Sequence, residues 1–271
     1  MAEGSIFVVL GSATGALACL HVASAAARIL GRPPITVLHV RAAPASTILP
    51  SEEVLGARQI EALARQESAA DADLAELIAR GGELGATWRS LAGYEVEEIR
   101  RAAPGVRLAI LPHPRDELPG HREALDTVLF EAGLPVVMVP ASSALSSTSL
   151  FCGHLALGWR DSGITRRAVA TFAPFIQAAE RVTVVEVSEG DEAFPQSALA
   201  ALAPLRPDAR FETVSPEDGR IGSALLAAAA RCGADTLLIG AHRHGVLADM
   251  MFGTVTRTVL ENATIPVLLS A

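Results

Sequence analysis

A loop near the end of the sequence contains the residue types best suited to bind an anion. The apolar run 237–239 ends at Gly240, a polar segment follows, and Gly253 and Thr254 open a second apolar segment with helical spacing. Glycine lets backbone N–H groups approach phosphate oxygens, and a helix N-terminus adds oriented donors and a favourable dipole. The same glycines would also suit ordinary turns between a strand and a helix. The spacing alone therefore favours a phosphate site and plain turn chemistry about equally.

Three side chains inside this loop carry positive charge or can gain it. They are His242, Arg243 and His244, and Asp249 follows them. A zinc site needs three or four converging protein ligands, so the pattern favours solvated loop histidines, which could contact a polyphosphate when protonated. In the first half of the chain, His113 takes the position equivalent to His242. We predict no metal site.

The sequence contains no arrangement typical of a catalytic centre. No serine lies in a G-x-S-x-G elbow beside a base and an orienting acid. The paired carboxylates Glu52–Glu53 and Glu97–Glu98 are neighbours on expected helices, where adjacent side chains diverge by about 100°. They are interpreted as solvated helix faces, and we predict no catalytic residue.

Composition excludes several classes of partner. The chain has 271 residues and a net charge of -8, so long-range electrostatics disfavour nucleic acid and anionic membranes. No basic leader precedes residue 10, and no apolar run reaches the roughly 18 residues that span a bilayer, which predicts a cytoplasmic protein. Cys19, Cys152 and Cys232 are widely spaced and odd in number, so we expect buried free thiols.

The hydrophobic periodicity predicts the elements that would hold the glycine loop in place. Short β-branched runs alternate with amphipathic segments, which is typical of parallel strands joined by helical crossovers. The first half predicts strands at residues 6–10, 35–40, 86–91, 106–111 and 135–139, and helices at 14–30, 51–80, 95–103 and 123–131. The second half predicts strands at 155–158, 182–187, 210–214, 236–240 and 266–269, and helices at 165–179, 197–203, 221–231 and 253–261.

The two halves share the same order of elements, which indicates a tandem duplication. Residues 258–268 resemble residues 127–137, and in both segments a helix end and a turn lead to a proline before a strand. Residues 141–149 are small and serine-rich, as expected of a linker. We therefore predict two α/β domains, 1–145 and 146–271, each a doubly wound, Rossmann-like sheet of five mainly parallel strands.

The chain resembles a tandem universal stress protein. The resemblance is strongest in residues 235–269, where Gly240, Gly253 and Thr254 fall in the family's order, and it extends to residues 158–162 and 182–187. It implies strand order 3-2-1-4-5 in each domain, a ligand crevice at the carboxyl ends of strands 1 and 4, and pairing of the two domains through their last strands. Further dimerisation of the chain is possible, and a subset of the family binds ATP.

The family's nucleotide-binding motif is altered in the second half. Nucleotide-binding members carry Gly, two residues, Gly, nine residues, Gly, then Ser or Thr. Gly240, Gly253 and Thr254 match this pattern, but Arg243 replaces the middle glycine. Arg243 could block the site, or its guanidinium could grip phosphate bidentately.

A second change affects the loop after the first strand of the second half. The family commonly has an aspartate two residues before a serine, on the ribose side of the nucleotide; here Arg160 takes that position before Ser162, and Asp161 comes one residue late. Either Asp161 takes the role in a shifted loop or the ribose contact is lost. The resemblance and the charged side chains of the loop together give these candidate nucleotide-binding residues: Trp159, Arg160, Asp161, Ser162, Val187, Ile239, Gly240, His242, Arg243, His244, Gly253, Thr254 and Val255.

The first half departs further from the motif. Residues 111–115 read Leu-Pro-His-Pro-Arg, and Arg122–Glu123 stands where the family has Gly-Ser. Pro112 and Pro114 remove backbone donors and flexibility. We predict that the first domain is degenerate for nucleotide binding.

The resulting hypothesis is a cytoplasmic stress-response protein whose second domain binds a nucleotide, ATP first, together with Mg²⁺ if it binds. Slow ATP hydrolysis is the most that the residues suggest. The alternative is a regulatory or scaffold protein of the same fold that has lost nucleotide binding and acts through its surfaces or another small anion.

Overall fold

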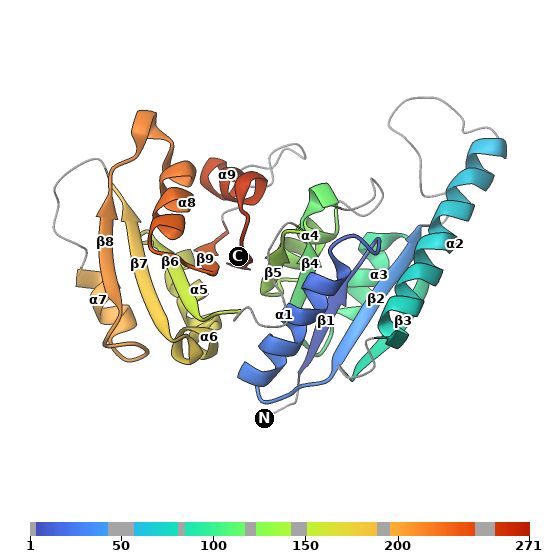
Figure 1. The fold of residues 1–271 in the computed structure, drawn as a ribbon, viewed down its shortest axis with the longest axis horizontal. Helices are drawn as coiled ribbons and strands as arrows, with labels where there is room; N and C mark the ends of the chain where they lie inside the picture. The colour runs from blue at the N-terminus through green and yellow to red at the C-terminus, as the bar shows by residue number, and fades with distance from the viewer. Residues whose placement is uncertain are drawn as a thin grey trace.

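The computed structural model describes residues 4–42, 57–80, 85–116, 123–141, 151–188, 196–241 and 253–271. Within them the chain forms a single sheet in the order β3-β2-β1-β4-β5-β10-β9-β6-β7-β8, with the two halves side by side (Figure 1). The strands are β1 Ser5–Val9, β2 Ile35–Ala42, β3 Ala86–Gly93, β4 Val106–Pro112, β5 Val136–Val139, β6 His154–Trp159, β7 Arg181–Val187, β8 Arg210–Val214, β9 Thr236–Gly240 and β10 Val267–Ser270.

Helices connect the strands and cover both faces of the sheet. They are α1 Ala16–Ile29, α2 Ala57–Arg80, α3 Glu95–Ala102, α4 Ala124–Asp126, the π-helix η5 Thr127–Glu131, α5 Gly163–Thr171, α6 Ala173–Ala178, α7 Gln196–Leu202, α8 Ile221–Arg231 and α9 Thr254–Asn262, with 3₁₀ turns η3 Pro114–Asp116 and η6 Glu217–Gly219. The α/β class and the alternation predicted from the sequence are confirmed. The predicted boundary near residue 146 and the linker lie outside the described residues.

The strand order in each half is the predicted 3-2-1-4-5, and every pair within a half is parallel. The halves join through β5 and β10, which pair antiparallel with Val137 opposite Leu268. Both strands are fully buried in their apolar residues. This confirms the expected pairing through the last strands, and it is favourable because each strand covers the edge that the other would expose.

Two apolar clusters form the core, one on each face of the sheet. One cluster contains the apolar faces of α1, α5 and α6, and the other contains those of α3, α8 and α9. Alternate residues along each strand enter opposite clusters: Leu157 of β6 belongs to the first cluster, and Ala156 belongs to the second. Whether a residue takes an odd or an even position along its strand, which we call its parity, therefore decides on which face of the sheet its side chain lies.

The helix expected at residues 165–179 is in fact two helices. Helix α5 ends at Thr171, Phe172 takes a non-helical conformation, and α6 begins at Ala173 with Pro174 in its first turn. Proline has no N–H to donate, and its ring clashes with the carbonyl four residues earlier. Pro174 is tolerated at a helix start, so the chain begins a new helix there.

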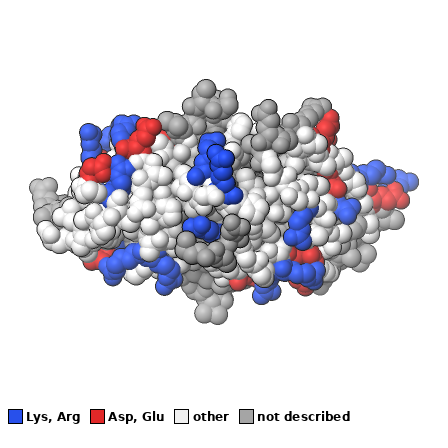
Figure 2. Space-filling model, turned by 90° about the horizontal axis from the view of Figure 1, so that it is seen from below, with Lys and Arg blue, Asp and Glu red and all other residues white. Residues whose placement is uncertain are grey.

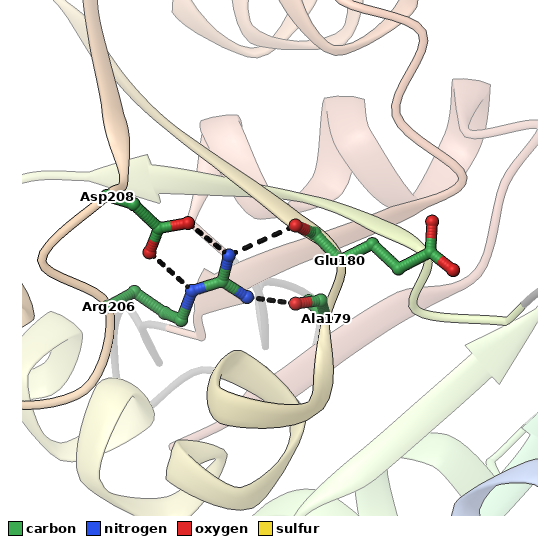
Figure 3. Close-up of polar contacts among 4 residues, drawn as sticks. All are labelled: Ala179, Glu180, Arg206 and Asp208. Carbon is green, nitrogen blue, oxygen red and sulfur yellow. Dashed lines mark hydrogen bonds and ion pairs between the residues drawn. The ribbon is translucent and has the colours of Figure 1, made fainter.

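A partly buried arginine, Arg206, holds the end of α6 and the start of β7 to the loop after α7 (Figure 3). Arg206 binds Asp208 through Nε at 2.8 Å and through a terminal nitrogen at 2.6 Å. The same guanidinium donates to the carbonyls of Ala179 and Glu180. The bidentate Arg206 contact lowers the pKa of Asp208 to about 2. Arg206 therefore ties three segments together by charge-assisted hydrogen bonds.

The three cysteines are free. Cys19 and Cys152 are buried, as expected, whereas Cys232 is only partly buried. Burial, with Asp235 nearby, raises the pKa of Cys152 to about 12. The Cys152 thiol is therefore protonated at neutral pH and fills core space rather than reacting. No helix in the described part of the chain is both long and apolar enough to cross a membrane.

Candidate functional site

A cavity of about 330 Å³ opens at the carboxyl ends of β6, β7 and β9, beside α8 and α9. This is where the resemblance places a ligand crevice, because β6 and β9 are the first and fourth strands of the second half. The cavity is lined by Gly158, Trp159, Arg160, Thr165, Val185, Glu186, Val187, Ile221, Leu225, Ile239, Gly240, Val255 and Thr256. Its volume lies in the range typical of small-molecule sites.

The two ends of this cavity differ chemically. At the end formed by β7 and α8 the walls are apolar, with Val185, Val187 and Leu225 facing it. At the end formed by β9 and α9 the lining includes Gly240 and the first turn of α9 at Val255. The N-terminus of α9 supplies free N–H groups and a positive dipole end. An apolar group and an anionic group can therefore be held at opposite ends.

Gly158 creates the space between these ends. A Cβ at this position would lie 2.8 Å from Leu225 Cδ2 and 3.1 Å from Ile239 Cγ2. Gly158 sits in β6 on the same face as Ala156, so any side chain there would enter the cavity. The sequence prediction missed Gly158 as a cavity-forming residue. The break that it makes in the apolar pattern of the strand was the available signal.

Gly240 allows a close approach between β9 and α5. A Cβ at Gly240 would lie 2.8 Å from Ile164 Cγ2 and 3.3 Å from the backbone nitrogen of Thr165. The first glycine of the loop therefore has a packing role besides any contact with a ligand. Gly253 is the N-cap of α9 and has an extended backbone, with φ -62° and ψ 154°. Thr254 begins the helix, and its carbonyl accepts a hydrogen bond from the Thr258 hydroxyl.

The segment after β6 places three residues that the resemblance groups together in three different settings. Ser162 caps α5, with its Oγ accepting from the Thr165 N–H at 3.1 Å. Asp161 forms an ion pair with Arg166 and does not line the cavity. Arg160 does line it. The suggestion that Asp161 replaces the family's aspartate therefore has no support in the described contacts.

Trp159 borders the cavity but its ring packs elsewhere. It is buried in the same cluster as Leu157, on the face of the sheet covered by α5 and α6. The cavity lies on the opposite face, beside Ala156 and Val185. Strand alternation therefore makes Trp159 a core residue whose backbone reaches the site.

Of the other residues predicted to bind a ligand, Val187, Ile239, Gly240 and Val255 line the cavity. Gly253 and Thr254 lie next to it at the start of α9 but are not among its lining residues. His242, Arg243 and His244 lie outside the described residues. The prediction did not include the remaining lining residues, which only the fold brings to this place: Thr165, Glu186, Ile221, Leu225 and Thr256.

The corresponding place in the first half is nearly filled. Val8 of β1 pairs with Ile110 of β4, and at the matching position of the second half Leu157 of β6 pairs with Leu238 of β9. The next residues along β1 and β6, which are Val9 and Gly158, therefore correspond to each other. The cavity there measures only about 10 Å³ and is lined by Val9, Gly11, Glu95, Leu111, Pro112, Pro114, Ala124 and Leu125. Such a space holds about one water molecule.

The hydrogen bonds between neighbouring strands also correct the predicted equivalence of His113 and His242. The His113 N–H donates to the Val139 carbonyl, and the Ala241 N–H donates to the Ser270 carbonyl at the matching rung. His113 therefore corresponds to Ala241 rather than to His242. The sequence comparison was one residue off because prolines replace the glycine at the end of β4, which leaves no motif residue to fix the alignment.

His113 is also not a solvated loop residue. It is buried, its Nε2–H donates to the carbonyl of Leu260 in α9, and its Nδ1 accepts from the Arg115 N–H at 2.9 Å. Burial lowers its pKa. Leu260 lies in the last turn of α9, where carbonyls lack helical partners. His113 thus links the first half to a helix that borders the cavity of the second.

A second hollow, of about 590 Å³, lies at the amino ends of β6, β7 and β8. Its rim carries both charge signs, and arginine and acidic side chains lie together over the left-hand part of the molecule in Figure 2. Arg231 pairs with Glu212 at 2.6 Å. The charged residues around it are Glu180, Arg181, Asp208, Arg210, Glu212 and Arg231. Because the positive and negative side chains balance, the hollow has no preference for a cationic or an anionic ligand.

Metal binding finds no support in the described part of the chain. No group of three or more histidine, cysteine, aspartate or glutamate residues there could hold a metal ion. His242, His244 and Asp249 fall outside it.

Comparisons with known proteins agree with the fold. The model of the Universal stress protein family matches residues 164–270. A universal stress protein from Archaeoglobus fulgidus DSM 4304 is 15% identical, with 99% of this chain and 96% of that chain covered and a TM-score of 0.70. A functionally unknown protein from Pseudomonas aeruginosa PAO1 is 17% identical, with 98% and 92% covered and a TM-score of 0.58. No curated protein matches in sequence. Residues 164–270 thus match the model of the Universal stress protein family, and over its whole length the chain shares the fold of the universal stress protein from Archaeoglobus fulgidus DSM 4304.

Proposed function

We propose that the second half of this protein binds a nucleotide, with ATP as the leading candidate, and that the protein acts in a stress response. The observation that carries this proposal is the 330 Å³ cavity, with apolar walls at one end and a helix N-terminus at the other. A nucleotide has the same polarity, because its base is flat and largely apolar and its phosphates are anionic. The match to the family model over residues 164–270 adds support.

The walls suggest how the nucleotide lies. The base packs between Val185, Val187 and Leu225, at the β7 and α8 end. The phosphates point toward Gly240 and the N-terminus of α9, where N–H groups are free to donate. The ribose then crosses the carboxyl end of β6, above Gly158. Arg243, in the loop between β9 and α9, is proposed to act on the phosphates, either by gripping them or by restricting access.

The first half is proposed not to bind nucleotide. Val9 and Pro112 occupy the positions of Gly158 and Gly240, and the remaining space is about 10 Å³. The expected stoichiometry is therefore one nucleotide per chain.

Isothermal titration calorimetry of the purified full chain with ATP tests the proposal. We expect one site per chain, and we expect Arg243→Gly to change the affinity: a rise means that the arginine restricts access, and a fall means that it grips phosphate. Absence of heat and of any shift in melting temperature with millimolar ATP, ADP and AMP would overturn nucleotide binding. The regulatory or scaffold hypothesis would then be the better one.

A further inference from the structure

Arg160 occupies the middle of the cavity, between its apolar and anionic ends. Across the sheet the order is β9, β6, β7, so a residue at the end of β6 lies between Gly240 of β9 and Val187 of β7. Arg160 directly follows β6 and lines the cavity. Side-chain parity places it on the same face as Gly158, toward the cavity. A nucleotide oriented as proposed would place its sugar against this guanidinium.

The carboxylates of Asp161 and Glu186 are close to Arg160 in the chain or in the sheet, but they point away from the cavity. Asp161 pairs with Arg166 outside the cavity. Glu186 lies opposite Trp159 in the ladder, and parity places its side chain on the Trp159 face, away from Val185 and Val187. No ion pair of Arg160 is found among the described residues. Among the described residues, the middle of the cavity therefore presents the Arg160 cation, whereas strand parity directs the Glu186 carboxylate toward the opposite face of the sheet.

A cation at this position changes which sugar fits best. A carboxylate accepts hydrogen bonds from free ribose hydroxyls, whereas an arginine beside the ribose accommodates a phosphate on it, as in dinucleotide sites that select a 2′-phosphate. Guanidinium and phosphate form paired, charge-assisted hydrogen bonds. We propose that Arg160 makes this site selective for adenine nucleotides that carry a phosphate on the ribose as well as on the 5′ position. The inference rests on the proposed nucleotide site.

The test compares ligands of equal phosphate number. Adenosine 2′,5′-bisphosphate, adenosine 3′,5′-bisphosphate and ADP each carry two phosphates, so a preference among them does not come from the number of phosphates. ATP, whose net charge at neutral pH is close to that of a bisphosphate, is the control for total charge. Calorimetry on the full chain should show at least one ribose-phosphorylated ligand binding tenfold or more tightly than ADP. A tenfold ratio corresponds to about 1.4 kcal/mol.

Two variants assign the preference to Arg160. Arg160→Ala should remove the preference by weakening the bisphosphate tenfold or more while changing ADP less than threefold. Arg160→Asp should reverse it, because a carboxylate repels the ribose phosphate and accepts from free hydroxyls. The matched control is Arg231→Ala, which removes an arginine at the far end of α8, beside Glu212, and should leave the ratio unchanged.

The outcomes separate this inference from the proposed function. If ADP and ATP bind but neither bisphosphate binds more tightly than ADP, the selectivity is overturned and nucleotide binding stands. If Arg160→Ala weakens ADP and the bisphosphates equally, the arginine holds the 5′ phosphates and the selectivity is again overturned. If no nucleotide binds, the proposed function itself fails. Circular dichroism and melting curves check that each variant is folded, which is expected because Arg160 is exposed.

Discussion

At the residue scale, a missing side chain separates the open half of the molecule from the closed one. Gly158 and Val9 occupy equivalent positions in the two halves of the sheet, and the cavities beside them measure about 330 and 10 Å³. The nearest atoms to a Cβ at Gly158 are the ends of the Leu225 and Ile239 side chains. A substitution there meets movable side chains and fills the cavity rather than breaking the backbone.

We therefore predict that Gly158→Val closes the proposed nucleotide site. Affinity for ATP should fall at least thirtyfold, while the melting temperature should change by only a few degrees because flexible side chains absorb the contact. The control is Gly163→Ala, since a Cβ at Gly163 meets nothing within 4 Å. Unchanged ATP affinity in Gly158→Val would show that ligand binds elsewhere.

Arg206 illustrates a residue whose role is purely structural. Its side chain is 12% exposed and it supplies donors to the Ala179 and Glu180 carbonyls. Arg206→Ala should lower the free energy of unfolding by about 2 kcal/mol, because the Ala179 and Glu180 carbonyls and the Asp208 carboxylate lose their charged partner. Arg220→Ala, which breaks an exposed pair 3.5 Å long with Asp218, should cost under about 1 kcal/mol. Urea denaturation compares the two, and equal effects would contradict the structural role of Arg206.

At the element scale, the first turn of α5 has a capping role where the resemblance implies a binding role. Ser162 has an extended backbone and caps the Thr165 N–H, and Gly240 packs directly against this turn. The turn therefore supports the edge of the cavity without its serine reaching inside. Pro174 then limits α5 to nine residues, so the helix ends at Thr171 and α6 follows as a separate element.

Ser162→Ala should consequently cost about 1 kcal/mol of stability with little change in ATP affinity. Ser162→Asp should retain most of the stability, because aspartate is also a good N-cap. Thermal melting and calorimetry give the two readouts. A tenfold loss of ATP affinity in both variants would instead place Ser162 in the binding site.

At the scale of the whole molecule, the two halves are joined by a sheet edge and by a buried histidine. The β5–β10 pair makes the sheets continuous, and α1 contacts α6 across the junction. His113 adds a hydrogen bond from the end of β4 to the last turn of α9. The helix that borders the cavity is thus held by a residue of the half whose own cavity is closed.

This contact predicts a pH dependence of stability. Burial lowers the pKa of His113 below its ordinary value of 6.5, so the unfolded chain binds a proton more readily than the folded one. The contribution to stability is full above about pH 7 and declines as the pH falls below 6.5. His113→Gln keeps a donor for Leu260 but does not titrate, so the stability difference between wild type and variant should shrink between pH 8 and pH 5. Urea denaturation across this range measures it, and parallel pH profiles would contradict the prediction.

The order and type of most elements followed from the sequence because they depend on local patterns. Short, continuous apolar runs at β1, β4 and β9 and the shared proline before β5 and β10 predicted the strands and the duplication. The break at Phe172 could also have been predicted, since Pro174 is visible in the sequence. Element ends were less certain because capping and tertiary contacts decide them.

The candidate site was predicted less completely, because it depends on which side chains face the cavity. The glycine loop and Arg160 were visible as motif positions, but Leu225 and Ile221 reach the cavity only because α8 packs beside β7. Trp159 and Asp161 lie within the motif and still point elsewhere, one because of strand parity and the other because of Arg166. Residues that are neighbours in the sequence can therefore point their side chains in different directions.

By itself the sequence determined the α/β class and the tandem repeat, because hydrophobic periodicity encodes local structure, and its resemblance to a known family implied the strand order and the place of the crevice. The tertiary structure decided what local patterns cannot encode. It showed that Gly158 opens one cavity while Val9 fills the other, that His113 is buried against Leu260, and that Arg160 faces the cavity while Asp161 does not. Each of these depends on strand register and on contacts between residues distant in the chain, which form only when the whole sheet is assembled.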